Sequence, residues 1–350
     1  NAIDHTDMNS GFIAIGSASE LTEALGSIKP MSNGAFVQEG LSIVEQISKL
    51  TQNRRENIIF NNKNSKNNGA WAQAFGGGTV KSDDKTIKGY NSVTSGLTLG
   101  YDKKIGNFLS HNHVGGALSF ARSNIDGVSK TGSHKDSINS YNLSLYNSNY
   151  RDNGLGFFNH NFLNASFNQY STIRDIAVGN YNARAQGDFD GASYFAKTIL
   201  GYSSKISNNL IISPNIGLKY FLKTQDSYEE NGAGNNGLKI ENDDFTNIIA
   251  EINIDSAYQF NYQGTNLAAK FNIGFERKLS DAKQKSTITF IGGGSEIENN
   301  SNNIQQNLFK AGLGLDLYHE DNQSFNINYD INLGSNFQSH FGSLNYKYEF

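Results

Sequence analysis

The sequence predicts an all-β fold: a twelve-stranded antiparallel transmembrane β-barrel with an N-terminal α-helix threaded through its lumen. Three observations predict it. Apolar and polar residues alternate with a period of two from Gly69 to Phe350, the connections between the alternating segments are short and long by turns, and a polar helix of membrane-spanning length precedes the first strand. The composition agrees, because 17 Tyr, 23 Phe, 36 Gly and only 2 Pro among 350 residues describe a strand-rich chain that is not disordered.

The composition also excludes several classes of protein. A mean hydropathy of −0.51, without any apolar run near the roughly 18 residues of a spanning helix, excludes a polytopic helical membrane protein. The net charge is −4 and Lys and Arg do not cluster, so no nucleic acid partner is predicted. The chain has no cysteine and therefore no disulfide or thiolate metal site. Asn1 opens a polar stretch that is unlike a signal peptide, so we expect a mature fragment or the C-terminal piece of a longer precursor.

The first 68 residues are organised differently from the rest. A short helical run is predicted over Ser19–Leu25, where Gly26 stops it, and a second helix from Ala35 or Phe36 to about Asn57. The second helix has apolar residues three and four apart at Val37, Leu41, Val44 and Ile47, with a flanking row of Phe36, Ile43 and Leu50. We expect three parts: residues 1–35 as the end of an upstream region, 36–68 as a helix with a polar linker, and 69–350 as the barrel.

The second helix fits a polar lumen better than lipid. About 22 residues at 1.5 Å each span roughly 33 Å, enough to cross a bilayer's hydrocarbon layer. Its other face is polar, with Gln38, Glu39, Ser42, Glu45, Gln46 and Lys49. A place on the membrane surface is the alternative, but interfacial helices are typically rich in Lys and Arg, and this face mixes Glu and Lys.

Twelve strands can be counted in the remaining chain. They begin near Ala70, Ser92, Asn112, Ile138, Leu155, Gly191, Leu210, Phe245, Thr265, Leu308, Ser324 and Ser339. Long connections are predicted at 76–90, 125–137, 173–190, 225–243 and 280–306, and short ones near 104–110, 151–154, 204–209, 261–264 and 320–323. Alternation alone also fits a soluble β-protein with its apolar face inward, but sorting of the loops by length favours an outer-membrane barrel.

No motif predicts a catalytic, cofactor or metal site. The pairs Asp83-Asp84 and Asp243-Asp244 could in principle activate a water, but both lie in predicted polar loops, where acids are ordinarily solvated. His111 and His113 could face one metal, yet no third ligand is near, so a pair beside a turn is the preferred interpretation. The glycine runs Gly76–Gly78 and Gly292–Gly294 precede no helix and are interpreted as loop apices or bulges.

Several segments together resemble the translocator domain of classical autotransporters, the type V secretion proteins. They are ELTEALGSIKP, the helix ending at Arg54 and Arg55, GAWAQAFGG at Gly69–Gly77, SGLTLGYDKKIG at Ser95–Gly106, NIGLKYF at Asn215–Phe221, and HFGSLNYKYEF at His340–Phe350. The resemblance implies a barrel in the outer membrane of a Gram-negative bacterium, contacting its lipids, that carries its own upstream passenger to the cell surface. The helix then plugs the pore.

The resemblance also implies partners and residue roles. Leu344, Tyr346, Tyr348 and Phe350 look like the C-terminal signal that the barrel-assembly machinery recognises, and periplasmic chaperones are expected partners. Arg54 and Arg55 are expected either to pair with lumen carboxylates or to lie solvated at the periplasmic mouth. Some family members cleave themselves at an Asn-Asn pair inside the helix, whereas Asn61-Asn62 and Asn67-Asn68 follow it here, which makes self-cleavage doubtful.

Three other functions stay open at this point. A passive channel or structural barrel would have no use for the helix and linker. An outer-membrane hydrolase would need a catalytic set in the loops, and none is found, so the chain is not expected to be an enzyme. Adhesion through the long loops is compatible with translocation, but these loops lack an aromatic anchor cluster.

Overall fold

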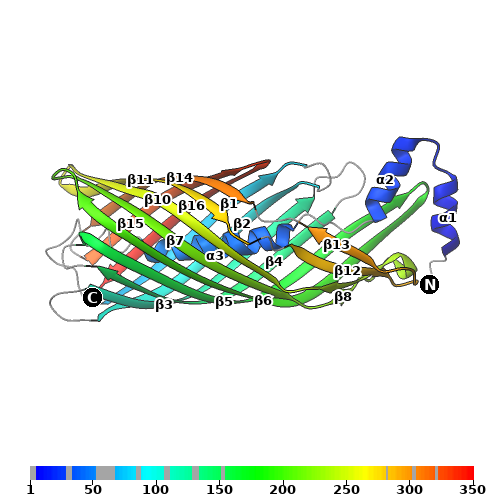
Figure 1. Ribbon diagram of the computed structural model, residues 1–350, viewed down its shortest axis with the longest axis horizontal. Helices are drawn as coiled ribbons and strands as arrows, with labels where there is room; N and C mark the ends of the chain where they lie inside the picture. Colours follow the sequence, from blue (N-terminus) through cyan, green and yellow to red (C-terminus); the bar gives the residue numbers. More distant parts are fainter. Residues whose placement is uncertain are drawn as a thin grey trace.

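The computed structural model describes residues 5–28, 34–52, 68–83, 88–105, 111–127, 134–150, 154–280, 283–301, 305–319 and 322–350. A long β-barrel surrounds one helix, and two further helices lie beyond one end of the barrel, at the opposite end from the C-terminus (Figure 1). The predicted fold class is confirmed. None of the described helices is both long and apolar enough to span a membrane.

The barrel is closed and antiparallel, with twelve strands in the order β1-β16-β15-β14-β11-β10-β7-β6-β5-β4-β3-β2. Its strands are β1 (Asn68–Lys81), β2 (Tyr90–Ile105), β3 (His111–Gly127), β4 (His134–Tyr150), β5 (Gly156–Val178), β6 (Tyr181–Lys205), β7 (Leu210–Gln225), β10 (Phe245–Tyr262), β11 (Thr265–Lys278), β14 (Asn307–His319), β15 (Gln323–Gly334) and β16 (Phe337–Glu349). The helices are α1 (His5–Ile13), α2 (Ala18–Ile28) and α3 (Ala35–Gln52).

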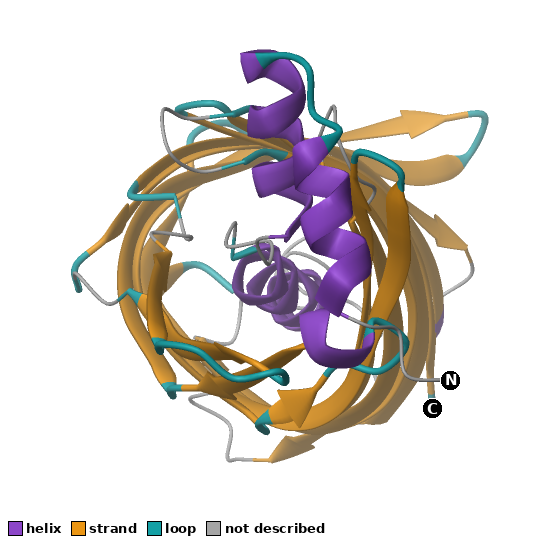
Figure 2. Cartoon of the chain, turned by 90° about the vertical axis from the view of Figure 1, so that its right-hand side faces the viewer, coloured by secondary structure: helices purple, strands orange, loops and turns teal. Residues whose placement is uncertain are grey.

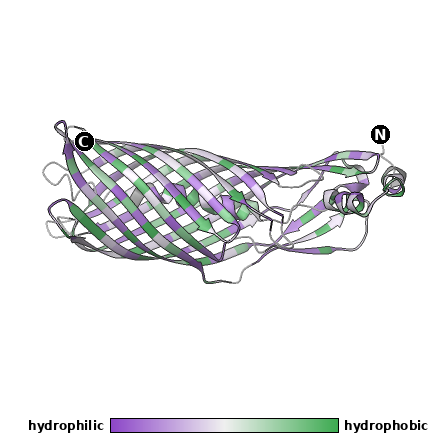
Figure 3. Cartoon of the chain, turned by 90° about the horizontal axis from the view of Figure 1, so that it is seen from above, coloured by the Kyte–Doolittle hydropathy of each residue, from purple (hydrophilic) through white to green (hydrophobic). Residues whose placement is uncertain are grey.

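The strands place their apolar side chains outward and their polar side chains inward. Leu97, Leu99 and Tyr101 of β2 are exposed, whereas Thr94, Thr98 and Asp102 are buried in the lumen. The same alternation appears as stripes of opposite hydropathy along the barrel wall (Figure 3). A barrel with an apolar exterior satisfies its backbone groups internally and suits a lipid environment.

The two ends of the barrel differ as the loop lengths predicted. Gln263 and Gly264 form a two-residue turn with φ values of 50° and 82°, which is the left-handed conformation that tight hairpins require. The C-terminus lies at this short-turn end, and the Phe350 amide donates to the Asn68 carbonyl at 3.0 Å as β16 closes against β1. In outer-membrane barrels short turns face the periplasm, so the opposite end faces outward.

The predicted loop at 173–190 was wrong, because β5 and β6 continue through it and turn only at Gly179 and Asn180. The physical reason is tertiary packing. Ile176, Val178 and Tyr181 near the turn are buried by α1 and α2, and these long-range contacts stabilise a hairpin that its polar sequence does not predict.

Two further predicted long loops contain a separate four-stranded sheet. Its strands are β8 (Tyr228–Glu229), β9 (Leu238–Asn242), β12 (Gln284–Phe290) and β13 (Ile297–Ser301), with a short 3-10 helix, η1 (Gly234–Asn236), between the first two. Leu238, Ile240 and Ile288 form its small apolar core. Each of these strands has only two to seven residues, too few for alternation to distinguish it from a loop. Their pairing joins distant segments of the chain, which a local sequence pattern does not show.

The glycine runs were half correctly interpreted. Gly292–Gly294 lie at the turn between β12 and β13, with φ of 93° and 133° at Gly293 and Gly294. Gly76–Gly78 are instead inside β1, so their interpretation as a loop apex or bulge was wrong. A Cβ on Gly77 would lie 2.0 Å from the His340 carbonyl oxygen, so close backbone packing explains this glycine.

Two of the three described α-helices were predicted, with different limits. The predicted run at Ser19–Leu25 is the middle of α2, and α1 was not predicted at all. The helix predicted to reach Asn57 is described as far as Gln52, and residues 53–57 lie outside the described part of the chain. Seen along the barrel, α3 lies inside the ring of strands (Figure 2).

Candidate functional site: the helix in the barrel lumen

The lumen is occupied by α3, which is buried on every side over most of its length. The buried side chains include both faces of the predicted amphipathic helix: Val37, Leu41, Ile43, Val44 and Ile47, and also Gln38, Glu39, Ser42, Gln46 and Ser48. The helix follows Gly34, whose φ of 61° turns the chain into the lumen and whose carbonyl accepts the Gln38 amide hydrogen at 3.1 Å. A helix buried all round needs separate partners for its apolar and its polar side chains.

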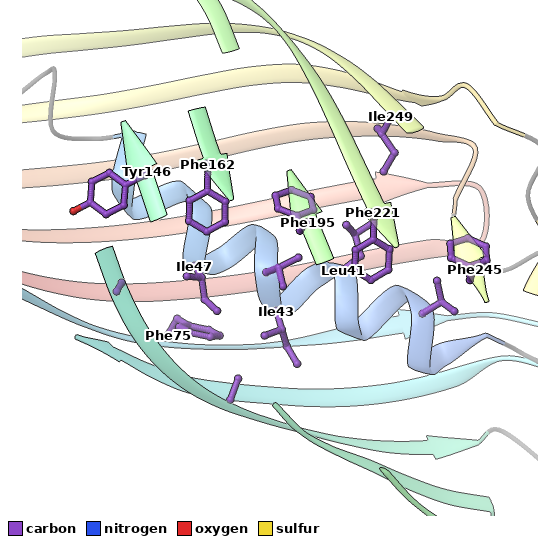
Figure 4. Packing of buried hydrophobic residues seen from close by; sticks show 14 of the residues in the cluster. Leu41, Ile43, Ile47, Phe75, Tyr146, Phe162, Phe195, Phe221, Phe245 and Ile249 are labelled. Carbon is purple, nitrogen blue, oxygen red and sulfur yellow. The ribbon is translucent and has the colours of Figure 1, made fainter. Parts of the chain in front are cut away.

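The apolar side of α3 packs against aromatic rings of the barrel wall. Leu41, Ile43 and Ile47 belong to one buried cluster with inward side chains from β1, β5, β6 and β7, namely Phe75, Phe162, Phe195 and Phe221 (Figure 4). The rings of Phe162 and Phe195 are 6.1 Å apart and nearly perpendicular. The lumen is therefore partly apolar, which explains why a helix with an apolar stripe is stable inside a barrel whose wall is otherwise polar.

The polar side of α3 contacts a cluster of charged side chains, which we call the lysine–glutamate cluster. It comprises Glu45 of the helix together with Lys197, Lys219, Glu251, Glu276 and Lys310 of the wall. Lys219, which is fully buried, lies 2.5 Å from Glu45 and 3.0 Å from Glu251, and it also pairs with Glu276. Lys310 pairs with Glu276 and lies 3.9 Å from Glu45.

The cluster depends on the helix for its charge balance. The wall supplies three lysines and two glutamates, so its charges sum to plus one, and Glu45 brings the sum to zero. Directly opposed strand positions carry like charges, since Lys197 faces Lys219 and Glu251 faces Glu276. Like charges directly across two strands are destabilising. Each member therefore needs its diagonal neighbours and Glu45, which indicates a wall built to receive this helix.

Two more polar contacts fix the helix along its length. The Glu39 carboxylate accepts hydrogen bonds from the Tyr90 hydroxyl at 3.2 Å and the Thr94 hydroxyl at 3.3 Å, both from β2. Near the other end, Lys49 pairs with Asp330 of β15 at 2.6 Å. These contacts set the depth at which α3 lies, because each pairs one helix position with one strand position.

An aromatic group surrounds the N-terminal end of α3. Phe36 makes edge contacts with Tyr170 at 5.0 Å and Phe189 at 5.9 Å, and Phe189 stacks on Tyr228 of the small sheet at 4.2 Å. The buried Lys223 ammonium lies 4.7 Å from the Tyr170 ring. At the far end of the helix a polar cavity of about 110 Å³ remains, and its lining includes Gln46, Lys49 and Asp330.

The four residues of the expected assembly signal lie on the outer face of the closing strand. Leu344, Tyr346, Tyr348 and Phe350 are all exposed, and the first three lie opposite Ala74, Ala72 and Ala70 of β1. Phe350 contacts Tyr101 with ring centroids 6.2 Å apart. The structure thus places them side by side at the seam of the barrel. Their recognition by an assembly machinery stays a prediction.

The remaining predicted positions are not brought together into a site. Arg54, Arg55, Asn61, Asn62, Asn67 and Asp84 lie outside the described residues, so neither a lumen pairing of the arginines nor self-cleavage is addressed. Asp243 and Asp244 are exposed between β9 and β10. His113 is buried and stacks on Tyr150 at 5.6 Å. In the described part of the chain no three His, Cys, Asp or Glu side chains converge as metal ligands.

Asp83 has a structural partner in its own loop. Its carboxylate accepts the Gly89 amide hydrogen at 2.7 Å and lies 3.3 Å from the Lys88 ammonium. The Gly89 hydrogen bond, followed by Lys88, holds the pKa of Asp83 below its ordinary value. These contacts link the chain just after β1 to the residues just before β2.

Sequence reasoning missed the wall residues that hold the helix. The signal that could have found them is a charged residue at an inward position of several neighbouring strands, as with Lys219, Glu251, Glu276 and Lys310. It could not have shown which of them meet Glu45, because that depends on the tilt of the strands and the depth of the helix.

Comparisons with known proteins agree with this architecture. Residues 70–330 match the family model described as the autotransporter beta-domain. The translocator domain of the autotransporter NalP from Neisseria meningitidis has a similar fold, with a TM-score of 0.66, 15% identity, and coverage of 92% of this chain and all of that one. The β-domain of the Bordetella autotransporter BrkA superposes with a TM-score of 0.59 and 16% identity over 81% of this chain and 99% of that one.

Curated relatives include outer membrane proteins of Rickettsia. The chain is 26% identical over 296 residues to outer membrane protein A of Rickettsia conorii, and 21% identical over 290 residues to outer membrane protein B of Rickettsia japonica. Each alignment covers 81% of this chain but only 14% and 17% of these relatives. With a barrel whose apolar face is outward, a helix in its lumen and a family match over most of its length, the chain belongs to the autotransporter beta-domain family and is a β-barrel of the Gram-negative outer membrane.

Proposed function

We propose that the barrel carries a passenger segment joined to its N-terminus to the cell surface, and that α3 afterwards stays in the lumen as a plug. The observation behind this proposal is the path of the chain. Residues 5–28 lie beyond the long-connection end of the barrel, α3 lies inside, and Asn68 begins β1 at the short-turn end beside the C-terminus (Figure 1). The chain therefore passes through its own barrel once, with the N-terminal part outside the cell.

The lumen contacts support the plug role. A polypeptide in transit must slide, whereas α3 is held by Glu39, Glu45 and Lys49 at three depths and by the aromatic cluster around Phe162 and Phe195. Because each charged contact needs its own strand position, the helix fits the wall in one register. We infer that this register is the stopping point of export.

The proposed role is transport and involves no catalysis by the barrel. Of the paired acids and histidines singled out in the sequence, Asp83 accepts a hydrogen bond from Gly89 and His113 stacks on Tyr150. The outer-membrane lipids, the barrel-assembly machinery and periplasmic chaperones are the partners that this role requires. The passenger itself would determine the biological activity.

An export assay tests the proposal. A signal peptide and an inert reporter are placed ahead of Asn1, the protein is produced in a Gram-negative cell, and external protease is added to intact cells. The reporter is expected to be removed by the protease. A matched deletion of His340–Phe350 controls for leakage and is expected to leave the reporter protected. An inserted barrel with a reporter that stays periplasmic would contradict the proposal and favour a passive channel.

A further inference from the structure

We propose that the β5–β6 hairpin is a docking site for residues 5–28 of the same chain, strong enough to hold this segment at the cell surface after the chain between it and α3 is cut. We call the hairpin end, Arg174 to Ala185, the platform, and residues 5–28 the docked segment. The inference rests on the proposed function, the export of the N-terminal segment to the cell surface. It adds a retention site that acts without a covalent link to the barrel.

The centre of the contact is Arg174 of β5. Its guanidinium is fully buried and donates from Nη1 to the backbone carbonyls of Ser27 at 3.3 Å and Ile28 at 2.8 Å, which are the last residues of α2. The final carbonyls of a helix have no partner within the helix and carry its negative end, so a cation placed there satisfies both needs. Arg174 therefore binds backbone carbonyls that are free only at the end of a helix, and this contact requires α2 to be folded.

A second buried group holds Arg174 in place. Glu230, next to the small sheet, forms a two-pronged pair with the guanidinium, with Nε 3.1 Å from one oxygen, and it also accepts the Leu238 amide hydrogen at 2.9 Å. A paired, fork-shaped geometry of this kind fixes the arginine's orientation. The remaining donor of Arg174 is thus aimed at the docked segment before that segment arrives.

Ser27 links the docked segment to the hairpin by a side-chain hydrogen bond. Its hydroxyl oxygen is buried and accepts the Ala177 amide hydrogen at 3.1 Å, and its single hydrogen is shared between the carbonyl oxygens of Ala24 at 2.8 Å and Ala177 at 3.1 Å. An edge of the platform that would otherwise expose backbone groups is therefore satisfied by a side chain from α2.

Apolar packing covers the rest of the platform. Ala24 of α2, with Met8, Phe12, Ile15 and Ile28, packs on a surface formed by Ile176, Val178, Tyr181, Ala183, Ala185 and Ala233. The two backbones meet at a pair of glycines: a Cβ on Gly11 would lie 2.1 Å from the Val178 carbonyl oxygen, and one on Gly179 would lie 2.3 Å from the Gly11 carbonyl oxygen. Such close backbone approach shows that α1 and the hairpin are tightly packed and complementary in shape.

Cutting the chain tests the docking directly. The full chain is exported with an epitope tag ahead of Asn1, and a Gly/Ser-flanked site for a specific protease is inserted between Ile28 and Gly34. Intact cells are first labelled with an antibody to the tag, which establishes export separately from retention. They are then treated with the protease, and the tag is measured in the cell pellet and in the medium after the cut is confirmed by size.

The tag is expected to stay with the cells after complete cleavage. Gly11→Ala should release it into the medium at least about tenfold faster, because differences in affinity at one interface appear mostly in the dissociation rate. Alanine is a better helix former than glycine, so faster release cannot come from a weaker α1. Gly16→Ala is the matched control, since its Cβ would meet only the Glu20 carboxylate at 3.7 Å, an ordinary contact distance, and the tag should stay bound.

A second variant tests the arginine without leaving an unpaired buried charge. The double substitution Arg174→Met with Glu230→Met removes both charges together, and heat-modifiable gel mobility reports whether the barrel is still folded. Faster release from a folded barrel supports the docking site. Prompt release of the tag from the cleaved parent chain, or equal retention by Gly11→Ala, would overturn it. A tag that cannot be labelled before cleavage would instead count against the proposed export function.

Discussion

At the scale of single residues, Glu45 is the side chain that links the helix to the charges of the wall. Lys219 lies between Glu45, Glu251 and Glu276, and all of these groups are shielded from bulk water. A buried pair adds little stability relative to an apolar pair, but removing one partner leaves a charge uncompensated. The cluster should therefore add little to the stability of the correctly placed helix, but it should strongly disfavour any other depth of α3, because the charges would then be left unpaired.

Glu45→Gln tests this interpretation. It leaves three lysines against two glutamates, and we expect the docking of α3 to weaken by roughly 3–5 kcal/mol, the usual cost of breaking a buried pair. The measurement is the rate of spontaneous channel openings of the purified protein in a planar bilayer, which should rise strongly.

Lys49→Ala provides the comparison in the same helix. Lys49 is 27% exposed, whereas Lys219 is fully buried, and Lys49 pairs with Asp330 beside the polar cavity. The expected loss is about 1 kcal/mol or less. Equal opening rates in the two variants would show that the lysine–glutamate cluster has no special part in holding the helix.

Gly100 illustrates a different residue-scale constraint. A Cβ at this position in β2 would lie 2.2 Å from the Trp71 ring, whose indole nitrogen donates to the Tyr146 hydroxyl at 2.9 Å. Gly100→Ala should displace the ring and lower barrel stability by roughly 1–3 kcal/mol, as overpacking does. The temperature at which the folded band disappears on a gel measures this loss. Gly116→Ala, whose Cβ would meet neighbours at 3.4 Å or more, should leave that temperature unchanged.

At the scale of elements, β16 combines closure of the barrel with the expected assembly signal. Phe350 and Tyr348 are exposed at the seam with β1 and contact each other at 6.1 Å. If they are read during assembly, Phe350→Ala should lower the amount of folded barrel in cells several-fold while leaving the melting temperature of the assembled protein near that of the parent. Leu315→Ala, another exposed outward residue, is the control. An equal loss for both would contradict a recognition role for Phe350.

The elements also show what sequence can and cannot predict here. The twelve barrel strands were predictable because each has one face in lipid and one in a polar lumen, so local alternation encodes their environment, as in β15 and β16. The β5–β6 hairpin beyond residue 173 was not, because its stability comes from Ile176 and Val178 meeting α1 and α2, which are over 140 residues away in the chain.

The candidate site was predictable to a similar degree. A helix of membrane-spanning length that is too polar for lipid indicates a lumen, and its stripe of Val37, Leu41, Val44 and Ile47 is buried as a unit. The sequence could not show that aromatic rings such as Phe162 and Phe195 meet this stripe, because inward aromatic residues look the same as girdle residues in a linear pattern.

At the scale of the whole molecule, we propose that the chain closes its own pore with the last part to pass through it. The wall residues of the lysine–glutamate cluster carry one excess positive charge, which Glu45 of α3 balances, and the aromatic rings of the lumen are covered by the apolar side of α3. The folded state is therefore the end point of a threading process, and the open barrel should exist only when the helix is absent or displaced.

The most direct measurement is the conductance of the purified protein in a planar bilayer, compared with a variant lacking residues 5–52. Heat-modifiable gel mobility confirms that both are folded. We predict small and infrequent current steps for the full chain and large, stable steps for the deletion, with Glu45→Gln switching between the two levels. Large, stable steps from the full chain, equal to those of the deletion, would contradict the account.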